Sequence, residues 1–321
     1  MKEKLASFII VMVLFSFESN PILCQSDLDS VGRKRLVWTS SALGLGYGTS
    51  TYLLNEVWYK DYPRSSFHFF NDWGEWNRMD KIGHVFSSQF QSNYAYHLYK
   101  WSGLSEKRSI LYGSVTSLMF QSTVELLDGF SSQWGFSGYD FGANIMGTSL
   151  FAIQQSLWGE QKIMFKVSGG KRNYEKIALA ENGNNISLNQ RANELFGKSV
   201  ASRFLKDYNS QTYWVSFNIN SLSKAQKWPA WLNMSIGYGA ENLYGGFENE
   251  WVENNNLITL SKQEYPRYHQ VYFSPDIDLT KIKTQSRLLK TVFGVLNIFK
   301  FPLPALEWSS QGGFSFHFLK F

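Results

Sequence analysis

The sequence has almost no cysteine, since Cys24 is the only one among 321 residues. A single thiol excludes a disulfide framework, and it also excludes a zinc site made of several thiolates. Proline is scarce as well, with 7 residues, and 44% of the chain is hydrophobic. This composition excludes a disordered or collagen-like protein. The chain must therefore fold by packing and polar pairing, without covalent cross-links.

Strong concentrations of charge are also absent. The formal net charge is +5, and the 31 basic residues are scattered along the chain. Recognition of nucleic acid requires a basic patch or stripe. We therefore expect no nucleic-acid partner.

An apolar run lies close to the N-terminus. Residues 7–17 form this run of eleven, which follows two lysines and ends in a polar segment. It is too short to span a bilayer, but it has the pattern of a secretory signal peptide. We predict that residues 1–24 are this signal peptide and that cleavage follows Cys24. The alternative is a lipidated Cys24, which Leu23 disfavours because lipid-attachment sites require a small residue at that position.

Aromatic residues, in contrast, are abundant, with 12 Trp, 17 Tyr and 26 Phe. Such residues are typical of cores, membrane interfaces and sugar-stacking surfaces. One aromatic cluster spans residues 67–76. We favour core packing for this cluster over contact with a bilayer interface or a sugar.

Four stretches lack Asp, Glu, Lys and Arg and are long enough for helices: residues 36–55, 82–99, 109–124 and 141–159. Each stretch also contains polar residues, so none is a plain lipid-spanning run. The pattern predicts a bundle of about four helices whose polar side chains face one another along a polar seam. The apolar faces would then contact either a membrane or, as in an ordinary soluble bundle, neighbouring helices.

From residue 161 onward the pattern changes to alternation and turns. A short helix is predicted near residues 190–205. Six segments have the β-branched and aromatic content of strands: residues 163–167, 212–222, 231–238, 268–279, 291–299 and 305–321. The predicted fold class is therefore α+β, with a helical bundle domain at residues 25–160 and a small antiparallel β-rich portion at residues 161–321.

Polar residues recur at helical spacing in three of the predicted helices. They are Asp80 and His84, then Gln121, Glu125 and Asp128, and then Asp140 and Asn144. Residues three or four apart share one face of a helix. Because short loops make the three helices antiparallel neighbours, we expect these side chains to meet in one buried polar network.

The same region resembles the YfiM-type family of predicted envelope lipoproteins over about residues 72–160. The matching segments are Met79-Asp80-Lys81-Ile82-Gly83-His84, Glu125-Leu126-Leu127-Asp128-Gly129-Phe130-Ser131 and Trp134-Gly135-Phe136-Ser137, with Asp140, Asn144 and Gly147. Segments at 205–214, 237–241 and 276–278 resemble long, Bacteroidetes-type forms of the family. The D-K-x-x-H and D-x-x-x-N-x-x-G elements are more remotely similar to VanZ-like membrane proteins. The resemblance implies an envelope protein and no particular reaction, because members of the family have no assigned activity.

The candidate catalytic residues are His84, Asp80, Glu125 and Asp140. An imidazole oriented by a carboxylate suits general-base catalysis, and an imidazole with several carboxylates suits a divalent metal. In the structural interpretation, Asp80 and Asp140 cap their helices and His84 bonds a neighbour. We favour the structural network, and we expect no metal and no cofactor. The further members of this network are Asp128, Asn144 and Gln121.

These observations favour an accessory protein of the cell envelope. We expect it on the periplasmic side of the outer membrane or within that membrane, in contact with lipid and with outer-membrane or periplasmic proteins as partners. The alternative function is a hydrolase or transferase that acts on lipid or cell-wall material through His84. That alternative requires the candidate residues to converge on a cavity which solvent or lipid can reach.

Overall fold

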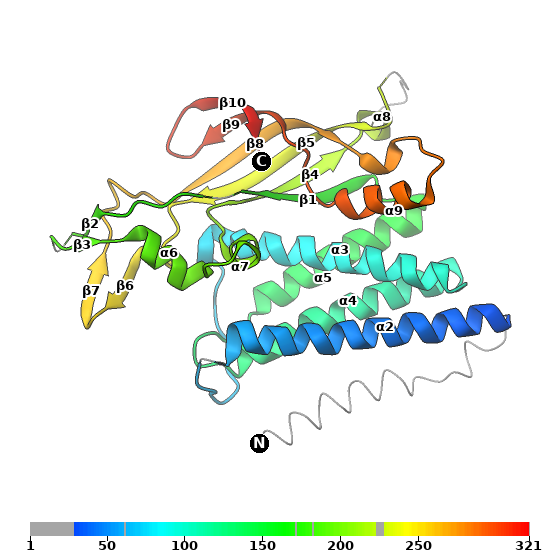
Figure 1. Ribbon diagram of the computed structural model, residues 1–321, viewed down its shortest axis with the longest axis horizontal. Helices are drawn as coiled ribbons and strands as arrows, with labels where there is room; N and C mark the ends of the chain where they lie inside the picture. Colours follow the sequence, from blue (N-terminus) through cyan, green and yellow to red (C-terminus); the bar gives the residue numbers. More distant parts are fainter. Residues whose placement is uncertain (1–28, 61, 171, 182, 223–227, 321) are drawn as a thin grey trace.

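The computed structural model describes residues 29–60, 62–170, 172–181, 183–222 and 228–320. The long helices of the first half form one layer, and the main sheet of the second half lies above them (Figure 1). The predicted signal peptide, residues 1–24, lies outside the described residues.

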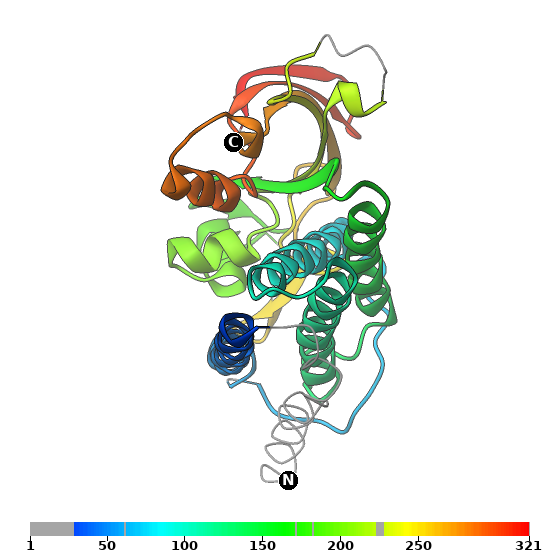
Figure 2. The same ribbon diagram turned by 90° about the vertical axis from the view of Figure 1, so that its right-hand side faces the viewer.

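Four long helices form the lower layer: α2 (Ser30–Leu54), α3 (Met79–Trp101), α4 (Glu106–Gly129) and α5 (Gly138–Trp158). Asp29 caps α2 and Ser137 caps α5, because each side chain accepts a hydrogen bond from an amide of the first turn. Helices α3, α4 and α5 pack against one another. Helix α2 lies alongside them and continues into the π-helical turn η2 (Asn55–Tyr59) (Figure 2).

The interior of the bundle is polar. Its buried side chains include Ser88, Gln89, Ser92, Ser109, Ser117, Gln121, Asn144, Thr148, Gln154 and Gln155. Several of the hydroxyls donate to helix carbonyls, as Ser117 does to Ser88 at 2.9 Å. Small residues allow the backbones to approach closely: a Cβ added to Gly147 on α5 would collide with Ser88 and with the carbonyl of Val85 on α3.

Six antiparallel strands form the main sheet, in the order β1-β4-β5-β8-β9-β10. They are β1 (Ile163–Gly169), β4 (Gln211–Phe217), β5 (Leu232–Glu241), β8 (Tyr268–Ile277), β9 (Leu303–Ser309) and β10 (Phe314–Lys320). Side chains alternate between the two faces of the sheet, as the period of a strand requires. On β8, Tyr272, Ser274 and Asp276 are buried, whereas Val271 and Phe273 are exposed.

The sheet is strongly curved, and its inner face encloses a second polar interior (Figure 2). Lys166 on β1 forms a 2.8 Å ion pair with Asp276 on β8, although β4 and β5 lie between these strands. In a flat sheet, strands three positions apart would be separated by about 14 Å, which a lysine side chain cannot bridge. The curvature therefore brings the two side chains together. The ammonium of Lys300 lies 3.9 Å from the other oxygen of Asp276.

The largest cluster of buried apolar side chains among the described residues lies beside these two layers. It involves α6 (Leu188–Phe196) and two short hairpins, β2–β3 (Ala178–Leu179 and Asn185–Ile186) and β6–β7 (Glu250–Glu253 and Asn256–Thr259). These elements extend from one end of the molecule, and α7 (Val200–Lys206) follows α6 beneath the main sheet (Figure 1). The remaining short elements are η3 (Glu75–Arg78), α8 (Ile219–Leu222), η4 (Leu279–Lys281) and α9 (Arg287–Leu296).

The α+β fold class, with a helical first half followed by an antiparallel sheet, is confirmed. The four predicted helices are present with shifted ends, and the region predicted as a strand at 305–321 forms the two strands β9 and β10. The hairpins β2–β3 and β6–β7 were not predicted. The division into domains at residue 160 stays a prediction.

The predicted strand at 291–299 is wrong, because most of it belongs to helix α9. Ser286 caps this helix by accepting a hydrogen bond from the amide of Leu289. Leu289, Val292 and Leu296 follow the helical period on one face. This amphipathic spacing outweighs the β-branched content on which the strand prediction depended.

Within the described ranges, none of the helices combines the length and the hydropathy that a membrane crossing requires.

We predict that Gly147→Ala destabilises the protein by about 1–3 kcal/mol, because the added methyl group forces α3 and α5 apart. Gly142→Ala on the same helix is the matched control, since nothing lies within 4 Å of a Cβ at that position. The control should gain about 0.5–1 kcal/mol, because alanine is the better helix former. Chemical unfolding curves measure both effects, and equal stability of the two variants would contradict the close approach of the helices.

Candidate functional site

A left-handed turn directs the chain into α3. Trp76, Asn77 and Arg78 have φ angles of 50°, 51° and 64°. This conformation costs residues other than glycine about 1–2 kcal/mol each. Two hydrogen bonds to the sheet side of the molecule hold the turn: the amide of Trp76 donates to Gly246 at 2.7 Å, and the hydroxyl of Tyr238 donates to Asn77 at 2.7 Å. The start of α3, with its charged residues, is thereby fixed against the sheet.

The buried ammonium of Lys81 lies at the centre of the candidate site. It lies 2.5 Å from Asp72, 2.8 Å from Asp140 and 3.4 Å from Asp80. Asp72 comes from the loop before α3, and it also accepts a 2.6 Å hydrogen bond from Ser137. One cation therefore joins this loop, the first turn of α3 and the first turn of α5.

His84 lies one turn further along α3 and contacts all three helices of the bundle core. Its Nδ1 atom lies 3.0 Å from Oδ1 of Asn144 and 3.6 Å from Oε1 of Glu125. Because a carbonyl oxygen can only accept, Nδ1 donates to Asn144. The Nε2 atom faces Asp80 at 3.8 Å and Asp140 at 3.9 Å. The imidazole therefore lies between one amide and three carboxyl groups.

The sheet half of the chain also contributes to the site. Tyr208, which lies between α7 and β4, donates a 2.6 Å hydrogen bond to Asp80. Tyr213 on β4 packs against Gly83, where an added Cβ would lie 2.9 Å from the tyrosine hydroxyl. Gly83 therefore permits the close contact between α3 and the sheet that brings tyrosines to the cluster.

Asp128 extends the network along α4, and Gln121 lies on the same helix. Asp128 accepts a 2.7 Å hydrogen bond from Tyr59 of η2, and Gln121 is buried. Burial raises the pKa of Asp128 to about 7, although the hydrogen bond from Tyr59 opposes this shift. The Tyr59–Asp128 pair connects the end of α2 to the bundle.

Burial also changes the protonation of the carboxyl groups around His84. It raises the pKa of Glu125 to about 9, and the negative charges of Asp128 and Asp80 contribute. It raises the pKa of Asp140 to about 11, again with a contribution from Asp80. Glu125 and Asp140 therefore hold their protons at neutral pH.

Two other carboxyl groups stay ionised. Burial opposes the ionisation of Asp72, but hydrogen bonds with Asp140, Lys81 and Ser137 lower its pKa. Burial likewise opposes the ionisation of Asp80, and electrostatic attraction by His84 and Lys81 lowers the pKa of this group. At neutral pH the ammonium of Lys81 is thus balanced by the carboxylates of Asp72 and Asp80.

The geometry permits a test of the metal-site interpretation. Asp80, His84 and Asp140 each offer one atom that could bind a metal, and these three atoms lie within 4.8 Å of one another. However, Lys81 contacts the facing oxygen of Asp140 at 2.8 Å, and Tyr208 donates to the facing oxygen of Asp80. A metal ion would have to displace the ammonium that already supplies the positive charge. We therefore assign no metal to these residues.

The structure brings together most of the residues that the sequence singled out. Asp80, His84, Glu125, Asp140 and Asn144 meet in one cluster. The interpretation that the two aspartates cap their helices is wrong, because Ser137 caps α5 and no side-chain cap begins α3. Both aspartates lie in the first turn instead.

Sequence reasoning missed four members of the site: Lys81, Asp72, Tyr208 and Tyr59. Lys81 is next to Asp80 in the D-K-x-x-H element, so this motif was the available signal. The others lie in loops or in an irregular turn, where no periodicity marks a buried face.

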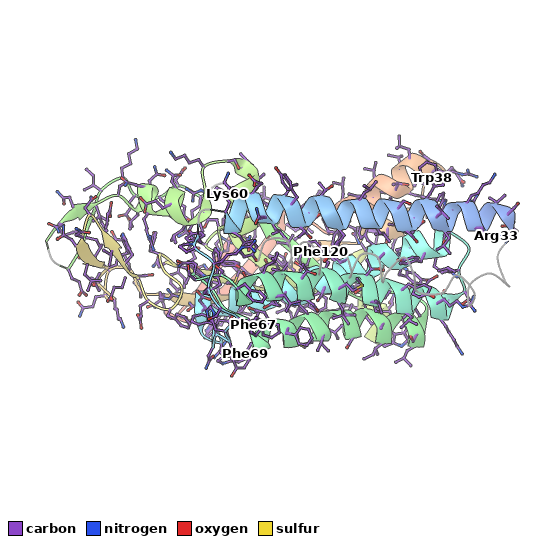
Figure 3. All side chains as sticks on the ribbon, turned by 90° about the horizontal axis from the view of Figure 1, so that it is seen from below. Arg33, Trp38, Lys60, Phe67, Phe69 and Phe120 are labelled. Carbon is purple, nitrogen blue, oxygen red and sulfur yellow. The ribbon has the colours of Figure 1, made fainter. Side chains whose placement is uncertain are left out.

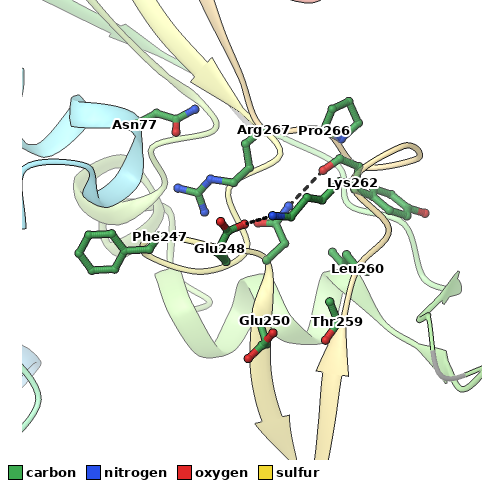
Figure 4. Close-up of a pocket in the computed structure, with 11 residues that line it drawn as sticks. Asn77, Phe247, Glu248, Glu250, Thr259, Leu260, Lys262, Pro266 and Arg267 are labelled. Carbon is green, nitrogen blue, oxygen red and sulfur yellow. Dashed lines mark hydrogen bonds and ion pairs between the residues drawn. The ribbon is translucent and has the colours of Figure 1, made fainter.

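A separate polar pocket of about 480 Å³ lies near the left-handed turn and is lined by Asn77, Glu248, Lys262 and Arg267, among others (Figure 4). Glu248 and Lys262 form a 3.1 Å ion pair there. Arg267 donates to the carbonyls of Gly245 and Gly246 at 2.5 and 2.6 Å. Because these groups bind one another or the backbone, the pocket is less suited to a ligand than the region around Lys81.

Residues 68–156 match a family described as predicted periplasmic lipoproteins (DUF2279). The match spans little more than a quarter of the chain, but it includes α3, α4 and all but the last two residues of α5. Of the residues of the cluster around Lys81 and His84, only Tyr59, Tyr208 and Tyr213 lie outside the match. No curated protein and no solved structure matches the chain. The chain is therefore similar, over its candidate site, to an uncharacterised family of envelope proteins.

We predict that His84→Gln changes the free energy of unfolding little, because glutamine retains a donor for Asn144. His84→Leu should cost about 1–3 kcal/mol, because it leaves a buried acceptor without its donor. Thermal and chemical unfolding of both variants checks the prediction. An equal loss of stability in the two variants would show that hydrogen bonding is not what His84 contributes.

We also predict that the free energy of unfolding depends on pH because of Glu125. Its pKa of about 9 in the folded protein exceeds the ordinary value of 4.5, so the folded state holds this proton more tightly than the unfolded state. Stability should therefore be highest below about pH 4.5 for this group and fall by up to about 1.4 kcal/mol per pH unit as the pH rises towards 9.

Glu125→Gln removes this titration. Between about pH 6 and pH 8, the variant should lose about 2–3 kcal/mol less stability than the wild type does. Glu160→Gln, at an exposed surface ion pair, is the control and should behave like the wild type. Parallel curves for wild type and Glu125→Gln would mean that Glu125 is ionised in the folded protein.

Proposed function

We propose that this protein is an accessory protein of the cell envelope that associates with the outer membrane and acts through protein partners. Its similarity to predicted periplasmic lipoproteins supports the envelope location. The similarity to YfiM-type proteins and the more remote one to VanZ-like proteins remain part of this proposal. The observation that carries it is the distribution of apolar side chains.

Both layers of the molecule have polar interiors and apolar outer faces. Exposed apolar residues on the helices include Val37, Trp38, Leu45, Leu111, Ile145, Met146, Ile153 and Leu157. On the sheet they include Ile236, Phe273, Leu306, Trp308, Phe314, Phe316 and Phe318. Apolar patches of this extent are rare on monomeric soluble proteins and mark contacts with membranes or partners.

Helix α2 is a clear example of a helix with apolar side chains on its outer face. Trp38 projects from the outer side of the helix and is 73% exposed; the charged residue Arg33 lies near the start of α2, and Lys60 follows η2 at the other end (Figure 3). The aromatic residues Phe67 and Phe69 lie at one end of the bundle in the same view. Phe67 packs against Phe130, but Phe69 is 74% exposed. Phe69 also packs against Phe67 and Phe136, so both rings belong to one aromatic cluster. The exposed part of Phe69 supports a contact with a membrane or a partner.

The strand order supports a protein partner. Strand β10 pairs with β9 and lies at the edge of the sheet. The opposite edge strand, β1, is partly covered, since Val167 exchanges backbone hydrogen bonds with the segment at Ile298 and Lys300. An open, hydrophobic edge strand is a template for a strand from another chain. β10 is therefore the place where we expect a partner to bind.

A second candidate function is the hydrolase or transferase that uses the His84 cluster. Its support is the convergence of His84, Asp80, Glu125 and Asp140, and one buried oxygen of Glu125 that makes no hydrogen bond. Of the described pockets, the one that reaches this region is lined by Lys81 and not by His84. Retention of function by His84→Gln would remove this candidate, because glutamine does not titrate.

Fractionation of the producing bacterium tests the membrane proposal. We expect the wild type in the outer-membrane fraction, and we expect a triple variant with Phe314, Phe316 and Phe318 changed to serine to shift towards the soluble periplasm. These three side chains are 68–77% exposed, so the variant should still fold. A variant with exposed Ile177 and Val200 changed to serine is the matched control and should fractionate like the wild type.

The same experiment with Cys24→Ser separates protein-mediated association from a lipid anchor. If the protein is recovered in the soluble periplasm with and without Cys24, the membrane proposal fails. A stoichiometric outer-membrane protein that co-purifies in mild detergent with the wild type, but not with the β10 variant, would support the partner.

A further inference from the structure

An apolar groove of about 590 Å³ lies between the helical bundle and the outer face of the sheet. Its volume is within the range of about 300–1,000 Å³ that is typical of small-molecule sites. Helix α3 contributes Ile82 and Val85, and helix α5 contributes Ala143 and Met146. The facing wall is formed by residues of four strands: Phe165, Val215, Ile236 and Val271. The groove therefore suits a hydrocarbon chain.

One of the residues of α5 that line the groove has no side chain. Gly142 lines it, and nothing lies within 4 Å of the position that a Cβ would take there. Glycine is a poor helix former, so its place in the second turn of α5 lowers stability. Open space at this position is what the glycine provides.

Polar character is concentrated where the groove opens. Trp73 and Tyr139 both line it, are 48% and 46% exposed, and pack with their ring centroids 5.1 Å apart. The guanidinium of Arg78 lies 4.9 Å from the ring centroid of Trp73. Within the described residues, Arg78 is exposed and forms no ion pair. The mouth of the groove therefore combines two amphipathic rings with one available cation.

The second cation beside the groove, Lys81, is not free to bind an anion. Lys81 lines the inner side, but its charge is already balanced by Asp72 and Asp80. An anion would therefore bind at Arg78, at the mouth, and an apolar chain would extend inward from it.

We propose that this groove binds one acyl chain of an anionic phospholipid, with the phosphate at Arg78. Arginine is well suited to phosphate because its planar donors bind two oxygens at once. Tryptophan and tyrosine prefer the boundary between hydrocarbon and headgroups. The exposed side chain of Met146 joins the groove to the apolar outer face of α5, from which a lipid would enter. The inference rests on the proposed membrane association, since the lipid must come from a membrane.

The test uses the full chain in mild detergent with added phosphatidylglycerol, and native mass spectrometry counts the lipids that stay bound. Wild type should retain a single phosphatidylglycerol. Gly142→Leu, which fills the groove, should retain about tenfold less or lower. The control Gly48→Leu on α2, where an added Cβ also meets nothing within 4 Å, should bind like the wild type.

Arg78→Gln tests the phosphate independently of the groove walls. It should abolish the preference for phosphatidylglycerol over diacylglycerol, which has the same chains and no phosphate. Thermal unfolding should show Gly142→Leu to be at least as stable as the wild type, so that lost binding cannot be attributed to misfolding.

Equal lipid retention by wild type and Gly142→Leu would overturn the inference, and so would retention of a peptide in place of lipid. The outcome is distinct from that of the fractionation experiment. A membrane-bound protein that retains no lipid would leave the proposed function intact and remove the lipid site. A protein that retains one lipid but is recovered in the soluble fraction would keep the lipid site and remove the proposed membrane association.

Discussion

The contact of Lys81 with three carboxyl groups is the interaction on which the helical half depends. Asp72, Asp80 and Asp140 come from a loop, α3 and α5, and all three surround one buried ammonium. Removing one partner of a buried ion pair typically costs about 3–5 kcal/mol, because the remaining charge is left without compensation. The loop before α3 and the start of α5 can therefore be buried together only while Lys81 is present. The contacts of Lys81 also fix the position of His84, which lies one turn later on α3.

The sheet half uses a similar arrangement. Lys166 and Lys300 face the single carboxylate of Asp276 inside the curved sheet, and their contact requires strands that are distant in the sheet to approach one another. Burial lowers the pKa of Lys300 to about 8, against the attraction of Asp276. Each layer thus has charges in its interior and apolar side chains outside, while the largest apolar core lies in the smaller elements beside them. Polar pairing, more than apolar packing, therefore fills the interior of each layer.

The parts of this arrangement that follow a regular period could be predicted from the sequence. Asp80 and His84, four residues apart, necessarily share a face of α3, and the short loops bring Glu125 and Asp140 to the same interior. Lys81 could not be placed in this way, because adjacent residues of a helix point about 100° apart. Its long side chain nevertheless returns to the seam. Asp72, Tyr208 and the left-handed turn lie in irregular segments, whose position depends on tertiary contacts. Helix α9 was mistaken for a strand because β-branched residues in a short segment suit either structure.

The polar cluster and the apolar groove are connected at the start of α3. Lys81 belongs to both: its ammonium contacts the carboxyl groups, and the residue lines the inner side of the apolar groove. The left-handed turn that begins α3 places Arg78 at the mouth of the same groove, three residues from Lys81. Strain in that turn is balanced by its hydrogen bonds to the sheet half, so the two halves of the chain must be docked for Arg78 to hold this position. A ligand that bridges the groove and Arg78 would therefore stabilise the docking of the bundle on the sheet. Binding and the mutual arrangement of the two layers are in this way coupled through a few residues at the start of α3.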